Sequence, residues 1–119
     1  MIGCDIAQIS RFNSLVCSDS FLKKYFTKNE IEYIFSKQNK AQTLAGLYAC
    51  KEAILKALKM GIGGQIRFTN LEILHDKNGA PTLNFTPELN YYLSKINCAH
   101  IDISISHDGD YAFAVCQVL

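Results

Sequence analysis

The sequence has almost no net charge, because 12 lysines and arginines stand against 11 aspartates and glutamates in 119 residues, a balance of +1. A chain without a strong basic field is a poor candidate for nucleic acid as its main partner. No apolar run approaches the ~18 residues that a membrane-spanning helix needs. The start of the chain also lacks the basic residues and the apolar core of a secretory signal. These absences favour an ordinary soluble globular protein.

Paired cysteines are missing as well. The five cysteines are odd in number and scattered, and no two of them form a C-x-x-C pair. This pattern argues against a disulfide framework and against a zinc site. It predicts that most of the cysteines are small buried side chains in a reducing cytoplasm. Because no repeat, low-complexity run or Pro/Gly-rich linker divides the chain, we expect a single domain over residues 1–119.

The most informative segment that is present runs from 44 to 58, inside a helix predicted over 43–60 and ended by Gly61. On a wheel at ~100° per residue, one side is an apolar stripe with Lys51 in its middle, and the other side carries small residues. Glu52 and Lys56 stand between these faces. A helix that is apolar on nearly all sides is normally central in its domain, and a charge buried there needs a partner. Glu52 is therefore a candidate functional residue.

The remaining elements are predicted by local signals. Thr27 and Glu30 form a capping box that starts a helix to about residue 37, and Thr86 precedes the proline of another helix over 87–96. A helical stretch is expected over 9–16, and strands are expected over 1–6, 66–74, 81–85, 101–106 and 111–118. Helices and antiparallel strands without a βαβ rhythm predict an α+β fold, with the central helix packed on an antiparallel sheet.

Three separate segments carry candidate chemistry. Asp5 stands at the end of the first strand, Glu52 and Lys56 lie on the central helix, and His107 closes a strand at the last hairpin. Each has an ordinary structural explanation: a strand-end cap, an i,i+4 pair worth roughly 0.2–0.5 kcal/mol, and a polar turn residue. Two acids from different elements, with lysines nearby, also suit Mg²⁺ shared with a phosphorylated substrate. Lys56 would then neutralise phosphate oxygens as a point charge.

Other motifs are absent or weak. No segment matches a Walker loop, a dinucleotide-binding glycine fingerprint, a nucleophile elbow or an H-E-x-x-H helix. The glycines of segment 61–64 are a weak phosphate signal, because the C-terminus of a helix repels anions. His75 and His100 have no comparable setting, and we interpret them as structural.

Taken in order, these segments resemble the holo-acyl-carrier-protein synthases, the small bacterial type of the 4′-phosphopantetheinyl transferase family. The resemblance is carried by Gly3-x-Asp5 with Arg11, by the segment 51–57, by Gly61-Ile62-Gly63, and by the segment 104–107 followed by Tyr111-Ala112. It spans nearly the whole chain. It implies the family's fold and transfer of the 4′-phosphopantetheine arm of coenzyme A to a serine of apo-acyl carrier protein. It also implies dependence on Mg²⁺ and a role in fatty acid biosynthesis.

The resemblance further implies residue roles. Asp5 and Glu52 correspond to the carboxylates that hold Mg²⁺, and Lys56 to a lysine that steadies or protonates the leaving oxygen. Glu52 itself and a metal-bound water are both candidates for the base that activates the carrier serine. His107 matches a histidine near the nucleotide end of coenzyme A. The other coenzyme A contacts implied are Lys56, Gly61, Gly63 and Ser106.

Partners follow from the same resemblance. Family members are homotrimers with active sites between subunits, so Asp5, Glu52 and His107 need not all come from one protomer. The acidic carrier protein is expected to dock on basic residues, with Arg11 at the matching family position and Lys23 and Lys24 as further candidates. Such docking weakens with salt.

One departure and one alternative accompany the resemblance. Leu47 stands where many family members carry an arginine, which affects how coenzyme A phosphate is held. The alternative function is a non-catalytic relative that binds coenzyme A or a carrier protein without turnover. The presence of both Asp5 and Glu52 argues against it, since a pure binder has no need for a pair of metal ligands.

Overall fold

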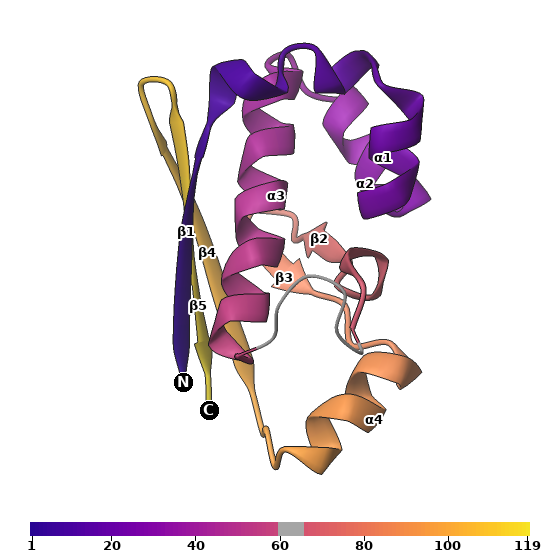
Figure 1. Cartoon of the computed structure of the whole chain (residues 1–119), viewed down its shortest axis with the longest axis vertical. Coiled ribbons are helices and arrows are strands. Elements are labelled where there is room, and N and C mark those ends of the chain that lie inside the picture. The colour runs from indigo at the N-terminus through magenta and orange to yellow at the C-terminus, as the bar shows by residue number, and fades with distance from the viewer. Residues whose placement is uncertain (60–65) are drawn as a thin grey trace.

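The computed structural model describes residues 1–59 and 66–119. Its larger sheet has three antiparallel strands in the order β1 (Ile2–Gln8), β5 (Tyr111–Val118) and β4 (Ile101–Asp108). The long helix α3 (Lys40–Ala57) lies along one face of this sheet (Figure 1). The central helix predicted from the sequence is therefore present, and it packs on an antiparallel sheet as expected.

Small residues allow α3 to lie directly on the strands. A Cβ on Gly3 would lie 2.1 Å from the carbonyl oxygen of Ala53 and 2.5 Å from the backbone nitrogen of Ala57, so β1 can approach the helix backbone only with glycine there. In the neighbouring strand β5, Ala112 and Ala114 are fully buried. The predicted small-residue side of the helix is confirmed as the side that meets the sheet.

The other described elements lie on the other side of α3 (Figure 1). The 3₁₀ turns η1 (Ile9–Phe12) and η2 (Leu15–Cys17) lead from β1 into two short helices, α1 (Asp19–Tyr25) and α2 (Lys28–Phe35). The later elements are η3 (Phe68–Asn70), a small sheet of β2 (Ile73–His75) and β3 (Pro81–Leu83), and helix α4 (Pro87–Lys95). None of the helices in the described ranges is long and apolar enough to cross a membrane.

Local signals predicted some elements and failed for others. The capping box of Thr27 and Glu30 is present, and α4 begins with its proline after Thr86. The helical stretch expected over 9–16 is instead a pair of 3₁₀ turns, because Ser10 bonds through both its backbone and its hydroxyl to the Asp110 carboxylate in the distant hairpin. The short helix α1 was not expected at all, although Ser18 caps it by accepting from the Phe21 backbone nitrogen.

The expected strand over 66–74 is also wrong in its first part. Its residues 68–70 form the turn η3, because the Asn70 side chain accepts a hydrogen bond from the Arg67 backbone nitrogen at 2.9 Å. Only the end of the segment pairs as β2. The central helix begins at Lys40, three residues earlier than predicted, because Asn39 caps it. The helix ends at Ala57, three residues before the predicted end at 60, with Leu58 as its C-cap and Lys59 at a positive φ of 58°. Gly61, which was predicted to end it, lies outside the described residues.

The outer face of the three-stranded sheet is uncovered. Ile6 of β1 stands directly opposite Phe113 of β5, and the two are 61% and 43% exposed. Ile2 and Tyr111 lie on the same face at 72% and 49% exposure. An antiparallel sheet can have one wet face, but that face is then polar, and a contiguous apolar patch usually marks an interaction surface.

Candidate functional site

The first candidate site joins β1 to the C-terminal half of α3. The Lys56 ammonium donates to Asp5 Oδ1 at 2.8 Å and to the Cys4 carbonyl oxygen at 3.2 Å. The Asp5 side chain is 19% exposed and that of Lys56 is 53% exposed, so the pair lies at the edge of the protein. The salt bridge of Lys56 thus runs to the strand, and the structure brings together two residues that the sequence holds 51 positions apart.

Glu52 lies one helical turn before Lys56 and completes this group. Burial raises the pKa of its carboxyl, the neighbouring Asp5 carboxylate raises it further, and Lys56 and the nearby Tyr48 hydroxyl counteract the shift. The hydrogen bond to Asp5 in turn raises the pKa of Lys56. A cation near two such carboxylates favours their charged forms, and Lys56 is the cation that the described residues place there.

These residues fit a magnesium ion. Carboxylate oxygens are the ligands Mg²⁺ prefers, and one or two of them plus substrate phosphates are its usual protein site. The described residues contain no group of three or more histidine, cysteine, aspartate or glutamate side chains placed to hold a metal. Asp5 and Glu52 would therefore be the protein's own ligands, with the rest supplied by substrate and water.

His107 lies elsewhere in the same chain. It faces α3 from β4, and its Nε2 would be 3.0 Å from a Cβ on Gly46. A cavity of about 120 Å³ beside it is lined by His107, Gly46, Tyr33 and His75, and a larger one of about 460 Å³ adjoins Tyr33 and His75. Neither cavity includes Asp5, Glu52 or Lys56 among its lining residues. Within one protomer, the structure does not bring His107 to the acids.

His75, which the sequence analysis interpreted as structural, lines both of these cavities. Its ring stacks on that of Tyr33 with centroids 3.8 Å apart. The Lys37 ammonium lies 4.7 Å from the centroid of the Tyr33 ring. The Nδ1 of His75 is buried and has no hydrogen-bond partner among residues 1–59 and 66–119. Burial and the nearby Lys37 lower the pKa of His75, which favours the neutral ring. No spacing in the sequence distinguishes this histidine, because its neighbours in the cavity come from α2 and β4.

The remaining residues predicted to contact coenzyme A are not gathered with His107. Ser106 is exposed on the outer face of the sheet, opposite Phe113, because successive strand residues point to opposite faces. It therefore does not share a face with its neighbour His107. Gly61 and Gly63 lie outside the described residues.

The three predicted docking residues lie on η1 and α1. Arg11 is exposed, and its charge acts on the Tyr48 hydroxyl, which places it on the Glu52 side of α3. Lys23 forms an exposed i,i+4 salt bridge with Asp19 at 3.0 Å. Lys24 is exposed, with its ammonium 5.3 Å from the centroid of the Tyr25 ring. All three side chains are therefore at the surface, where a docking partner could reach them.

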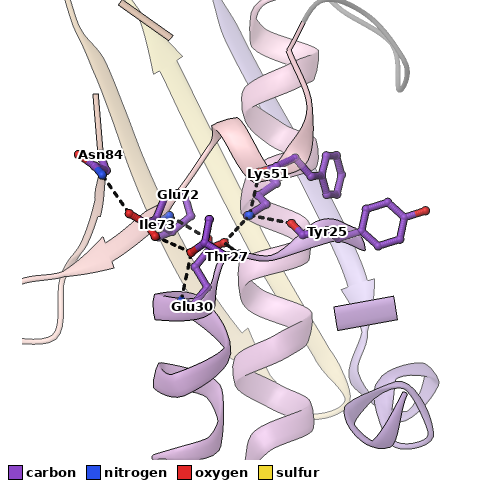
Figure 2. A network of polar contacts seen from close by, with 8 residues as sticks. Tyr25, Thr27, Glu30, Lys51, Glu72, Ile73 and Asn84 are labelled. Carbon is purple, nitrogen blue, oxygen red and sulfur yellow. Dashed lines mark hydrogen bonds and ion pairs between the residues drawn. The ribbon is translucent and has the colours of Figure 1, made fainter. Parts of the chain in front are cut away.

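The buried charge of the central helix is Lys51 rather than Glu52. Its side chain is fully buried, and its ammonium donates to Glu30 Oε1 at 2.6 Å and to the carbonyl oxygens of Tyr25 and Phe68 at 2.9 Å each (Figure 2). Glu30 in turn accepts from the backbone nitrogen of Ile73 at 2.9 Å. Burial raises the pKa of Glu30 and lowers that of Lys51, and each charge counteracts the shift of the other.

Comparison with known proteins gives a consistent result. Residues 1–116 match the family model described as the 4′-phosphopantetheinyl transferase superfamily. The chain is 42% identical over 117 residues to a holo-[acyl-carrier-protein] synthase of Finegoldia magna, covering 98% of this chain and 93% of that protein. It is 40% identical over 113 residues to a protein of the same name from Caldicellulosiruptor saccharolyticus, covering 95% and 90%.

Solved structures agree with the sequence comparison. The fold is similar to that of the Helicobacter pylori holo-[acyl-carrier-protein] synthase in complex with coenzyme A, with a TM-score of 0.87, 33% identity and full coverage of both chains. It is also similar to the Neisseria meningitidis holo-[acyl-carrier-protein] synthase, with a TM-score of 0.90, 28% identity and coverage of 99% and 96%.

Proposed function

Because the chain belongs to the holo-acyl-carrier-protein synthases of the 4′-phosphopantetheinyl transferase superfamily, we propose that residues 1–119 act as one Mg²⁺-dependent transferase domain. In this reaction the serine oxygen of apo-acyl carrier protein bonds to the phosphorus that bears the pantetheine arm of coenzyme A. The bond from that phosphorus to the bridging oxygen breaks, and adenosine 3′,5′-bisphosphate leaves. The reaction supports fatty acid biosynthesis in the cytoplasm, and the five free thiols suit a reducing compartment. The expectation that most of the cysteines are buried is wrong, since only Cys50 and Cys116 are.

The observation that carries the proposal is the Asp5–Glu52–Lys56 group at the junction of β1 and α3. Asp5 and Glu52 would hold Mg²⁺, which supplies charge neutralisation at the pyrophosphate when bound. Lys56 is half-exposed and long, so its ammonium can turn from Asp5 to a phosphate oxygen and give the leaving oxygen a proton. Glu52 is the protein's candidate for the base that accepts the serine proton, because burial and Asp5 hold its pKa above the usual value.

The cavity beside His107 is the proposed binding site for the nucleotide end of coenzyme A. Lys37 and Lys77 line the larger cavity that adjoins it at Tyr33 and His75, and in the part of the chain that the structure describes the His75 Nδ1 has no hydrogen-bond partner. Leu47 is almost fully buried and offers no polar group, so these cations would take the place of the family arginine at the coenzyme A phosphates. Arg11, on the turn η1, is the proposed first contact for the acidic carrier protein, with Lys23 and Lys24 on α1 as further contacts.

We further propose a homotrimer. One coenzyme A molecule needs both the acid pair and the nucleotide cavity, yet these lie apart within one chain. The uncovered apolar face of the larger sheet supplies a surface for other copies of the chain. In the assembly, the cavity of one protomer would complete the acid pair of the next, and Ser106 would contact coenzyme A at that interface.

The oligomer prediction is tested on the outer sheet face. Replacing Ile6 with aspartate should convert the assembly to monomers in light scattering after size exclusion, and should abolish transfer because the composite sites are lost. Phe35, on α2 and 47% exposed, is the matched control, and Phe35→Asp should leave the mass unchanged. A monomeric wild type with full activity would contradict the trimer.

The transfer itself is tested by mass spectrometry of apo-acyl carrier protein incubated with the protein, coenzyme A and Mg²⁺. We expect a mass gain of one phosphopantetheine arm per carrier, abolished by EDTA and restored by excess Mg²⁺. Binding of coenzyme A without any mass gain would instead support the non-catalytic relative. Full transfer in EDTA would remove the metal from the proposal while keeping the reaction.

A further inference from the structure

His75 has a fixed place in the wall of two adjoining cavities. The cavity of about 460 Å³ and the cavity of about 120 Å³ are both lined by His75 and Tyr33. The two rings lie almost parallel, with an angle of 6° between their planes and centroids 3.8 Å apart. Stacking of this kind restricts how the imidazole can turn. What His75 offers to a ligand therefore depends on which ring nitrogen is accessible and which one carries the proton.

Buried polar contacts hold the two stacked rings in position. Tyr33 belongs to α2 and His75 to β2. The Ile73 backbone nitrogen, at the start of β2, donates to Glu30 Oε2 of α2 at 2.9 Å (Figure 2). Glu30 Oε1 in turn accepts from the buried Lys51 ammonium of α3 at 2.6 Å. The strand that carries His75 is thereby joined to the helix that carries Tyr33 in the interior of the protein.

The two nitrogens of the His75 ring have different surroundings. Nδ1 is buried and, among residues 1–59 and 66–119, has no hydrogen-bond partner, although the side chain as a whole is only partly buried. A buried N–H without an acceptor is rarer in proteins than an acceptor with an unused lone pair. Burial and the Lys37 charge lower the pKa of His75 more than Asp76 raises it, which favours the neutral ring. We therefore assign its single proton to Nε2, and the ring has one N–H donor.

The charges that line the larger cavity favour an anion. Lys37 and Lys77 both line it. Asp76, the one acid among its described lining residues, accepts from the backbone nitrogens of Asn78 and Ala80 at 2.8 and 2.9 Å, so its carboxylate is occupied by the turn. Two ammonium groups and one imidazole N–H are donors without a matching acceptor in the cavity. A phosphate group, with several acceptor oxygens and negative charge, is the ligand that suits them.

We propose that His75 is a specificity-determining residue, whose Nε2–H donates to the 3′-phosphate of coenzyme A. The inference rests on the proposed function, which assigns the nucleotide end of coenzyme A to these cavities. The pyrophosphate has to reach Asp5 and Glu52, which line neither cavity. The 3′-phosphate is the remaining phosphate of the molecule, and the reaction leaves it unchanged. His75 would then distinguish coenzyme A from nucleotides that lack this group.

The test compares two ligands that differ by the 3′-phosphate. His75→Phe keeps a ring to stack on Tyr33 but removes both nitrogens. In isothermal titration calorimetry it should raise the Kd for adenosine 3′,5′-bisphosphate about tenfold, the effect of one lost hydrogen bond to a charged group. The Kd for adenosine 5′-monophosphate should stay within about twofold. The amide nitrogen of glutamine can occupy the position of Nε2, so His75→Gln should recover part of the loss.

Stability and kinetics give further readouts. The melting temperature of His75→Phe should be at least that of the wild type, because the substitution removes a buried nitrogen without a partner. In the transfer assay, KM for coenzyme A should rise about tenfold while kcat stays within about twofold, since His75 lies away from the acid pair. His100→Phe is the matched control, because this exposed histidine pairs with Asp102, and it should behave as wild type.

The outcomes separate this inference from the proposed function. An active wild type whose affinity for adenosine 3′,5′-bisphosphate is unchanged in His75→Phe would overturn the inference and leave the function standing. An equal loss for both nucleotides would also overturn it, since the ring would then shape the cavity without recognising the 3′-phosphate. If the wild type neither transfers the arm nor binds the bisphosphate, the proposed function fails, and the inference fails with it.

Discussion

Glu52→Gln should lower kcat for transfer about 10³-fold at saturating coenzyme A, an effect of the size seen when one key charge-stabilising group is removed. Glutamine keeps the shape of the side chain but removes the negative charge that would hold Mg²⁺ and the oxygen that would accept the serine proton. The initial rate of mass gain on the carrier protein measures the effect. A rate within threefold of the wild type would exclude Glu52 from both roles.

The same substitution makes a second, opposite prediction about stability. Burial and the neighbouring Asp5 both disfavour the charge on Glu52. A neutral side chain at this position removes both the desolvation cost and the repulsion from Asp5. The melting temperature of Glu52→Gln should therefore be equal to or higher than that of the wild type, as expected where function is maintained at the expense of stability. Glu88→Gln, an exposed acid in the first turn of α4, is the matched control and should change neither quantity.

Lys51→Met should have the largest effect on folding. It leaves the Glu30 carboxylate in the core without its counter-charge and leaves the carbonyl oxygens of Tyr25 and Phe68 without their donor. Breaking a buried ion pair from one side costs about 3–5 kcal/mol. Urea unfolding at one fixed protein concentration measures the loss, since an assembly is also stabilised by its concentration.

Two controls test whether the loss of stability comes from the unpaired buried charge. Removing both charges, in Lys51→Met with Glu30→Met, should recover a large part of the loss, because an apolar pair leaves no unpaired charge in the core. Lys23→Met breaks the exposed pair with Asp19 and should cost less than about 1 kcal/mol. A loss below about 1 kcal/mol for Lys51→Met would mean that Glu30 is already neutral in the native protein.

Several elements are specified by signals within a few residues of each other. Thr27 with Glu30, and Thr86 with the proline after it, start their helices as predicted because a capping side chain bonds to a backbone nitrogen only three residues away. The hairpin over 101–118 also has its expected strands, since alternation and a turn are local features. The turns over residues 9–17 were missed because the Asp110 carboxylate that fixes their start is 100 residues distant from Ser10.

The candidate site also has features that the sequence predicts and features that depend on distant contacts. The sequence by itself determined the central helix and its small-residue side, and the ordered family motifs predicted Asp5, Glu52 and Lys56 as candidate site residues, because motif spacing on a helix or strand can be read along the chain. Only the tertiary structure decided that Lys56 bonds Asp5, that His107 lies apart from the acids, and that Lys51 is the buried charge, with Glu30 as its partner. These contacts join residues 21 or more positions apart. A side chain's burial and partner depend on which distant segment packs against it, and no local pattern contains that information.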